Sequence, residues 1–89
     1  MTQSVILTLH GRVQGVGFRY FVKLNAENYG ISGFVKNKLS GIVHVEAEGE
    51  PAQLELFINA CRQGPSHAWV EKVDIQYCPV QDFNEFKIK

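Results

Sequence analysis

The spacing of apolar residues changes along this chain in an order that few folds accommodate. Residues 5–10 form a β-branched, apolar run that predicts a strand. From residue 18 the apolar positions recur at helical spacing. After this first helical stripe come two strand-like runs, a second helical stripe and two more strand-like runs. The sequence therefore predicts the order β-α-β-β-α-β with one additional terminal strand.

Both predicted helices have identifiable ends. The first carries a stripe interrupted only by Asn25, and Gly30 is placed to end it in the left-handed conformation. The second begins at Pro51, which suits the first helical position, and ends at Gly64 and Pro65. The stripe residues are Phe18, Phe21, Val22, Ala26 and Tyr29 in the first helix and Leu54, Phe57, Ile58 and Cys61 in the second.

The predicted strands carry apolar side chains at alternate positions. Residues 31–38 and 42–48 are joined by a tight connection and predict a hairpin, and residues 70–77 and 83–89 predict the last two strands. The apolar strand positions are Val5, Leu7, Leu9, Ile31, Val35, Val43, Val45, Ala47, Val73, Ile75, Tyr77, Phe86 and Ile88. We expect Trp69 and Tyr77 to pack in the core, and Glu46, Glu48 and Glu50 to lie on a solvated face.

This order of elements predicts an α+β, ferredoxin-like βαββαβ sandwich. We expect an antiparallel sheet of four to five strands with both helices on one face and a more polar opposite face. A chain of 89 residues has room for one hydrophobic core, so residues 1–89 are predicted to be a single domain.

The composition excludes several classes of function. Hydrophobic residues make up 45% and charged residues 20%, as in ordinary globular domains. Nine Lys and Arg balance nine Asp and Glu, which disfavours a nucleic-acid partner. No apolar run approaches the roughly 20 residues of a membrane span. Residues 1–4 lack the basic start of a signal peptide, so we expect a cytoplasmic protein with no membrane partner.

Neither the cysteines nor the histidines are spaced as metal ligands. Cys61 and Cys78 stand apart without a CxxC motif, which argues against a disulfide scaffold or a zinc site. We expect Cys61 to be a buried thiol, and a bridge between the two cysteines stays geometrically open. His10, His44 and His67 also lack ligand spacing, so no metal is expected.

The predicted topology brings two distant segments to one edge of the sheet. The first and second strands run parallel with the third between them, so their C-terminal ends lie at the same edge. The glycine-rich loop 15–19 leaves the first strand there, and Asn37 lies near the end of the second. The loop leads into a helix N-terminus, whose free N–H groups favour an anion, and Arg19 adds a planar cationic fork.

Two multi-residue motifs at this edge resemble the signatures of the acylphosphatase family. The first motif is residues 9–19 (LHGRVQGVGFR), and the second is residues 33–43 (GFVKNKLSGIV), closing at Gly49. The resemblance covers essentially the whole chain. It departs from the family pattern at Ile42, where the family usually has a threonine, so a hydroxyl is lost beside the hairpin. Position 17 is variable in the family, and Gly17 fits it.

The resemblance implies an enzyme that hydrolyses the carboxyl-phosphate bond of small acyl phosphates without a metal or cofactor, as a monomer. It implies that Arg19 binds the phosphoryl group and that Asn37 orients a water for in-line attack. The residues implied to form the phosphate-binding loop are Gln14, Gly15, Val16, Gly17, Phe18 and Arg19.

Other functions of this fold remain as alternatives. Ferredoxin-like domains also serve as RNA-binding and regulatory modules, but the third strand presents His44 and Glu46 where RNA-binding domains need aromatic side chains. A related domain acting inside a carbamoyl-transfer pathway is ranked below a free-standing enzyme, because no fused partner domain is expected. The glycine loop lacks the third glycine of a dinucleotide fingerprint and the Lys-Ser/Thr of a Walker loop.

Overall fold

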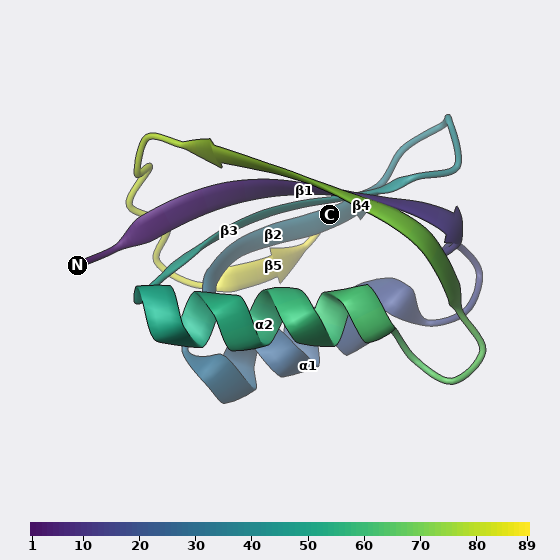
Figure 1. Cartoon of the computed structure of the whole chain (residues 1–89), viewed down its shortest axis with the longest axis horizontal. Coiled ribbons are helices and arrows are strands. Elements are labelled where there is room, and N and C mark those ends of the chain that lie inside the picture. Colours follow the sequence, from purple (N-terminus) through teal and green to yellow (C-terminus); the bar gives the residue numbers. More distant parts are fainter.

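A five-stranded sheet carries both helices on one of its faces (Figure 1). The computed structural model describes residues 1–89. In chain order the elements are β1 (Gln3–Arg12), α1 (Phe18–Tyr29), β2 (Ser32–Asn37), β3 (Val43–Gly49), α2 (Pro51–Gln63), β4 (Trp69–Cys78) and β5 (Phe86–Ile88). The predicted order of elements is confirmed. Neither helix is both long and apolar enough to cross a membrane.

The strands are ordered β4-β1-β3-β2-β5 across the sheet. Strands β1 and β2 both pair antiparallel with β3, so they run parallel with β3 between them, as predicted. Strand β5 pairs parallel with β2, which makes the complete sheet mixed around an antiparallel core of four strands. The parallel pairing arises because residues 79–85 carry the chain from β4 at one edge to β5 at the other (Figure 1).

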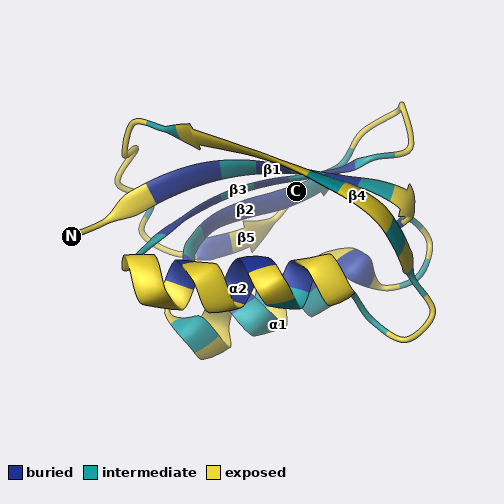
Figure 2. Cartoon of the chain, viewed as in Figure 1, coloured by how far each residue is buried: buried dark blue, intermediate teal, exposed yellow.

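The hydrophobic core lies between the sheet and the helices (Figure 2). Gly30 ends α1 at φ 68°, and the next residue, Ile31, donates its N–H to the Ala26 carbonyl. Pro51 begins α2 as predicted. The core side chains of the strands are Val5, Leu7, Leu9, Val35, Val43, Val45, Ala47 and Phe86, and those of the helices are Phe18, Val22, Ala26, Leu54, Phe57, Ile58 and Cys61.

The edge strand β4 is covered less than predicted. Trp69 is 69% exposed and Tyr77 is 64% exposed, so the expectation that both pack in the core is wrong. Val73 is half-buried, and Ile75 is also exposed. Because β4 has a neighbour on only one side, its apolar side chains gain little cover even where they lie beside buried residues of β1.

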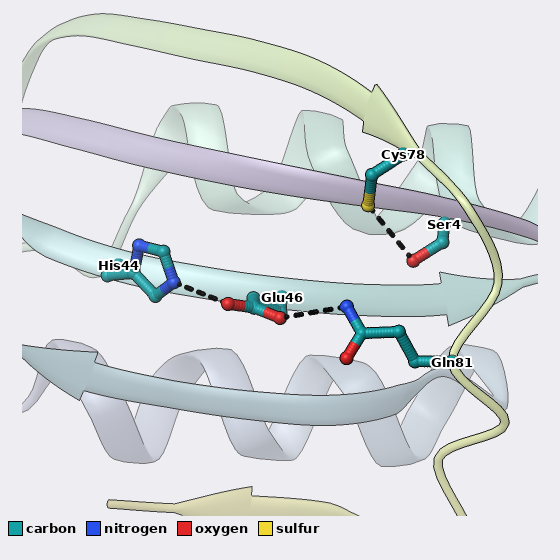
Figure 3. Close-up of polar contacts among 5 residues, drawn as sticks. All are labelled: Ser4, His44, Glu46, Cys78 and Gln81. Carbon is teal, nitrogen blue, oxygen red and sulfur yellow. Dashed lines mark hydrogen bonds and ion pairs between the residues drawn. The ribbon is translucent and has the colours of Figure 1, made fainter.

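The face of the sheet opposite the helices is not uniformly solvated. Glu48 is only 2% exposed, which contradicts its predicted place on a solvated face. Its carboxylate accepts hydrogen bonds from the N–H groups of Gln81 and Phe83 in the segment that crosses to β5. Glu46 is also largely covered, because its carboxylate contacts the His44 ring and the side-chain amide of Gln81 (Figure 3). Buried carboxylates are expected to be hydrogen-bonded in this way.

The two cysteines are free and lie in different environments. Cys61 is buried in the core, and burial raises the pKa of its thiol to about 12. Cys78 lies on the opposite face, where its thiol donates to the hydroxyl of Ser4 (Figure 3). The prediction of a buried Cys61 is confirmed, and the sheet separates it from Cys78.

Candidate active site

The loop between β1 and α1 and the hairpin between β2 and β3 lie at the same end of the molecule, on the right of Figure 1. A cavity of about 210 Å³ lies at this end. It is lined by Val13, Gly15, Gly17, Phe18, Arg19, Tyr20, Asn37 and Ile88. The structure therefore brings together the glycine loop, Arg19 and Asn37, as the topology predicts.

The β1–α1 loop turns through two glycines in the left-handed conformation. Gly15 and Gly17 both have φ 74°, a region that other residues adopt at a cost. Gly17 precedes α1 and offers no side chain to cap it, and the first turn of the helix holds no acidic residue. The N–H groups at the start of α1 therefore have no side-chain partner, and the positive end of the helix dipole faces the cavity end.

Arg19 is an exposed side chain at the start of α1. Its Nη1 donates a hydrogen bond to the main-chain oxygen of Lys89, at 3.2 Å, and no Asp or Glu side chain forms an ion pair with it. A guanidinium carries five N–H donors, so most of them stay free after this contact. The remaining donors of the guanidinium are therefore available to an anion.

Asn37 is the last residue of β2 and is half-buried. Its Oδ1 is the one buried side-chain polar atom in the structure that lacks a hydrogen-bond partner. Leaving a buried acceptor without a donor is costly, so such atoms in native proteins call for a specific explanation. Because Asn37 also lines the cavity, a donor inside the cavity would satisfy this atom.

Gln14 and Val16 do not line the cavity, although the family resemblance implies that they belong to the phosphate-binding loop. The side-chain amide of Gln14 instead donates hydrogen bonds to the carbonyl oxygens of Lys38 and Ile42, at 2.7 and 2.8 Å. The side chain of Val16 packs against the core. Gln14 therefore ties the loop to the hairpin that follows Asn37.

The substitution at Ile42 leaves the hairpin well bonded. The Ile42 carbonyl accepts hydrogen bonds from the Gln14 amide and from the N–H of Lys38. The hairpin closes further through the N–H of Gly41, which donates to the Lys38 carbonyl at 3.0 Å. These contacts hold the hairpin without a hydroxyl at position 42.

Three residues of the cavity wall are absent from the sequence prediction. Val13 and Tyr20 lie directly before and after the predicted residues 14–19, so their positions in the chain could have indicated that they line the cavity. Ile88 lies far along the chain and reaches the cavity because β5 pairs parallel with β2.

The histidines lie apart from this cavity. His10 contacts Asp74 and His44 contacts Glu46, each at 2.9 Å. The hydrogen bond from His10 is the largest cause of a lowered pKa at Asp74, and Lys72 adds to it. No group of three or more His, Cys, Asp or Glu side chains is arranged to hold a metal ion.

The family model described as Acylphosphatase matches residues 5–88. The chain belongs to the acylphosphatase family. An acylphosphatase from Nocardioides sp. is 37% identical over 89 residues, which cover 100% of this chain and 90% of that protein. The crystal structure of acylphosphatase from Bacillus subtilis superposes with a TM-score of 0.93 at 36% identity, covering 100% of this chain and 99% of that one.

The chain is also similar to part of a larger protein. A crystal structure of full-length HypF in its phosphate- and nucleotide-bound form superposes with a TM-score of 0.94 at 34% identity. The match covers 100% of this chain and 12% of HypF. The family fold therefore occurs both at about this length and as a segment of a longer chain.

Proposed function

We propose that this chain hydrolyses acyl phosphates by in-line attack of a water that Asn37 orients on a phosphoryl group held by Arg19 and the β1–α1 loop. Hydrolysis of acyl phosphates follows from membership in the acylphosphatase family. The roles of the individual residues are our proposal. The observation that carries it is the unpartnered Oδ1 of Asn37, in a cavity shared with Arg19 and an uncapped helix N-terminus.

The reaction makes few chemical demands on the protein. The leaving group is a carboxylate, which departs readily without a strong general acid. The protein must hold the phosphoryl group, stabilise its spreading charge and align a water opposite the leaving group. Positioning and electrostatic stabilisation therefore account for most of the catalysis.

Arg19 and the loop amides are suited to the phosphoryl group. The planar guanidinium can offer two parallel N–H donors to two phosphoryl oxygens. Residues 15–18 lead into the N-terminus of α1, where the helix dipole favours an anion. Gln14 and Val16 contribute through their backbone, because their side chains point elsewhere.

Asn37 is suited to the water. Its Oδ1 can accept a hydrogen bond from a water in the cavity, which satisfies the buried acceptor and orients the water. A carboxamide is not a base at neutral pH, so Asn37 does not take up the proton. The proton passes to an oxygen of the substrate as the new bond to phosphorus forms.

The Asn37→Ala variant tests this assignment by hydrolysis of benzoyl phosphate in the presence of EDTA. We expect kcat to fall by about 10²-fold, the range seen for loss of one preorganised group, with a smaller rise in KM. The matched control is Asn28→Ala, which alters an exposed asparagine of α1. An effect confined to KM would show that Asn37 binds the substrate and does not orient water.

The proposal extends to a monomer that acts in the cytoplasm on a small-molecule acyl phosphate. Sedimentation of the purified protein tests whether it is a monomer in solution.

The similarity to part of HypF supports a second candidate function, a phosphate-binding module beside other domains. We favour the enzyme because the Nocardioides relative, 90% of which the match covers, is an acylphosphatase. A folded protein that binds phosphate but turns over no acyl phosphate would support the second candidate.

A further inference from the structure

Glu48 is a buried carboxylate that the proposed mechanism does not use. It is 2% exposed and lies near the C-terminal end of β3. Val43, at the other end of β3, pairs with Asn37. A strand rises about 3.3 Å per residue, which places Glu48 about 17 Å from that pair along β3. Any effect of Glu48 on the reaction must therefore pass through other residues.

Both oxygens of this carboxylate hold residues 79–85, the segment that crosses from β4 to β5 (Figure 1). The Glu48 Oε2 accepts a hydrogen bond from the N–H of Gln81, and Oε1 accepts one from the N–H of Phe83 at 3.0 Å. Asp82, between them, has φ 60° and is the only non-glycine residue with a positive φ. N–H groups beside a left-handed residue can converge on one anion, and hydrogen bonds to an ionised group are the stronger kind. Glu48 therefore fixes the crossing segment on this face of the sheet.

Strand β5 has few other attachments. It is three residues long, lies at the edge of the sheet and pairs only with β2. Two flanking hydrogen bonds support it, from the N–H of Gly33 to the Glu85 carbonyl at 2.9 Å and from the N–H of Lys89 to the Val35 carbonyl at 2.8 Å. Phe86 is its one buried side chain. Segments with so few buried contacts have low local stability, so β5 depends on the segment that leads into it.

The end of β5 reaches the candidate active site. Ile88 lines the cavity together with Arg19 and Asn37. The main-chain oxygen of the next residue, Lys89, accepts the hydrogen bond from the Arg19 guanidinium. A displacement of β5 would therefore move one wall of the cavity and a contact of Arg19 together.

We propose that Glu48 is a positioning residue for this reaction, which aligns Arg19 from the far end of the sheet through the crossing segment and β5. The inference rests on the proposed function, in which Arg19 binds the phosphoryl group. Misplacement of a binding group by about 1 Å can cost up to 10²-fold in rate. Since Arg19 itself stays in place in the sequence, loss of the Glu48 contacts should lower kcat/KM by about tenfold.

The Glu48→Gln variant, assayed with benzoyl phosphate, measures this effect. Glutamine has nearly the same shape as glutamate but lacks the charge and one of the two acceptor oxygens. The matched control is Glu46→Gln, because Glu46 lies on the same face of β3 and contacts only the side chains of His44 and Gln81. We expect the control to keep the wild-type kcat/KM.

A double-mutant cycle with Arg19→Ala separates positioning from a general loss of structure. If Glu48 acts through Arg19, Glu48→Gln should have no further effect on kcat/KM once the guanidinium is absent. Distant substitutions without a shared partner act additively, so a general structural defect would give the same fold-loss in both backgrounds. Circular dichroism verifies that each variant is folded under the assay conditions.

Two substitutions at Asp82 test the crossing segment without changing the buried carboxylate, and they keep the test valid if Glu48→Gln unfolds. Asp82 is exposed. Glycine adopts φ 60° readily, whereas the ring of proline holds φ at about −65°. We expect Asp82→Gly to keep the wild-type kcat/KM and Asp82→Pro to lose about tenfold, again only where Arg19 is present.

The outcomes distinguish this inference from the proposed function. Wild-type kcat/KM in both Glu48→Gln and Asp82→Pro would overturn the inference alone. The same holds for a loss that persists undiminished without Arg19, or for an equal loss in Glu46→Gln. A wild-type protein that hydrolyses no benzoyl phosphate, or a fully active Arg19→Ala variant, would overturn the proposed function and this inference together.

Discussion

The side chain of Gln14 links the β1–α1 loop to the β2–β3 hairpin, and its replacement by leucine should loosen that link. The variant loses two hydrogen bonds, to the carbonyls of Lys38 and Ile42. Each carbonyl keeps a backbone donor, from Gly41 and Lys38 respectively, so no buried acceptor is left without a partner. At about 1 kcal/mol per bond, the free energy of unfolding should fall by about 2 kcal/mol.

The same change should affect catalysis through position. The loop carries Arg19, and the hairpin follows Asn37, so a looser link lets the two move relative to each other. Misplacement by about 1 Å can cost up to 10²-fold in rate, and we expect kcat to fall by about tenfold.

Urea unfolding and benzoyl phosphate hydrolysis measure the two effects, with Gln53→Leu on the exposed side of α2 as the matched control. A Gln14→Leu variant with the stability and kcat of the control would refute the linking role.

Two further predictions concern stability. A Cβ on Gly33 would lie 1.8 Å from the Glu46 carbonyl oxygen, whereas one on Gly41 meets nothing within 4 Å. In urea unfolding, Gly33→Ala should therefore lower the free energy of unfolding by more than about 3 kcal/mol, and Gly41→Ala by about 1 kcal/mol. Equal losses in the two variants would show that crowding at Gly33 does not determine the cost. Burial raises the pKa of the Cys61 thiol from 9.0 to about 12. Between pH 9 and 12 the unfolded chain therefore releases a proton that the folded chain keeps. The contribution of this thiol to the free energy of unfolding is complete below pH 9 and is lost between pH 9 and 12. The free energy of unfolding should fall by about 1 kcal/mol per pH unit more steeply in the wild type than in Cys61→Ala, and parallel profiles from pH 8 to 10 would exclude this cause.

Local signals were sufficient for most of the fold. The change between alternating and helical spacing predicted the element order, and the Gly30 and Pro51 helix ends follow from backbone conformation that these residues favour. The meeting of Asn37 with the glycine loop was also predictable, because parallel strands place their C-terminal ends at one edge.

Features that depend on nonlocal packing were not predictable from one sequence. Glu48 is buried because residues 79–85 cross over that face, and nothing in its own segment indicates this. Tyr77 alternates like a core residue, yet β4 lies at an edge. Ile88 joins the cavity only through parallel pairing of β5, and the direction of the Gln14 side chain depends on the position of the hairpin.

The most direct test of the account is the hydrolysis of benzoyl phosphate, in the presence of EDTA, by the wild-type protein beside Arg19→Ala and Arg19→Lys. We predict rapid turnover by the wild type, a loss of about 10²–10³-fold in Arg19→Ala, and a smaller but clear loss in Arg19→Lys, since an ammonium group does not reproduce the guanidinium fork. A folded Arg19→Ala variant with near wild-type turnover would contradict the proposed mechanism.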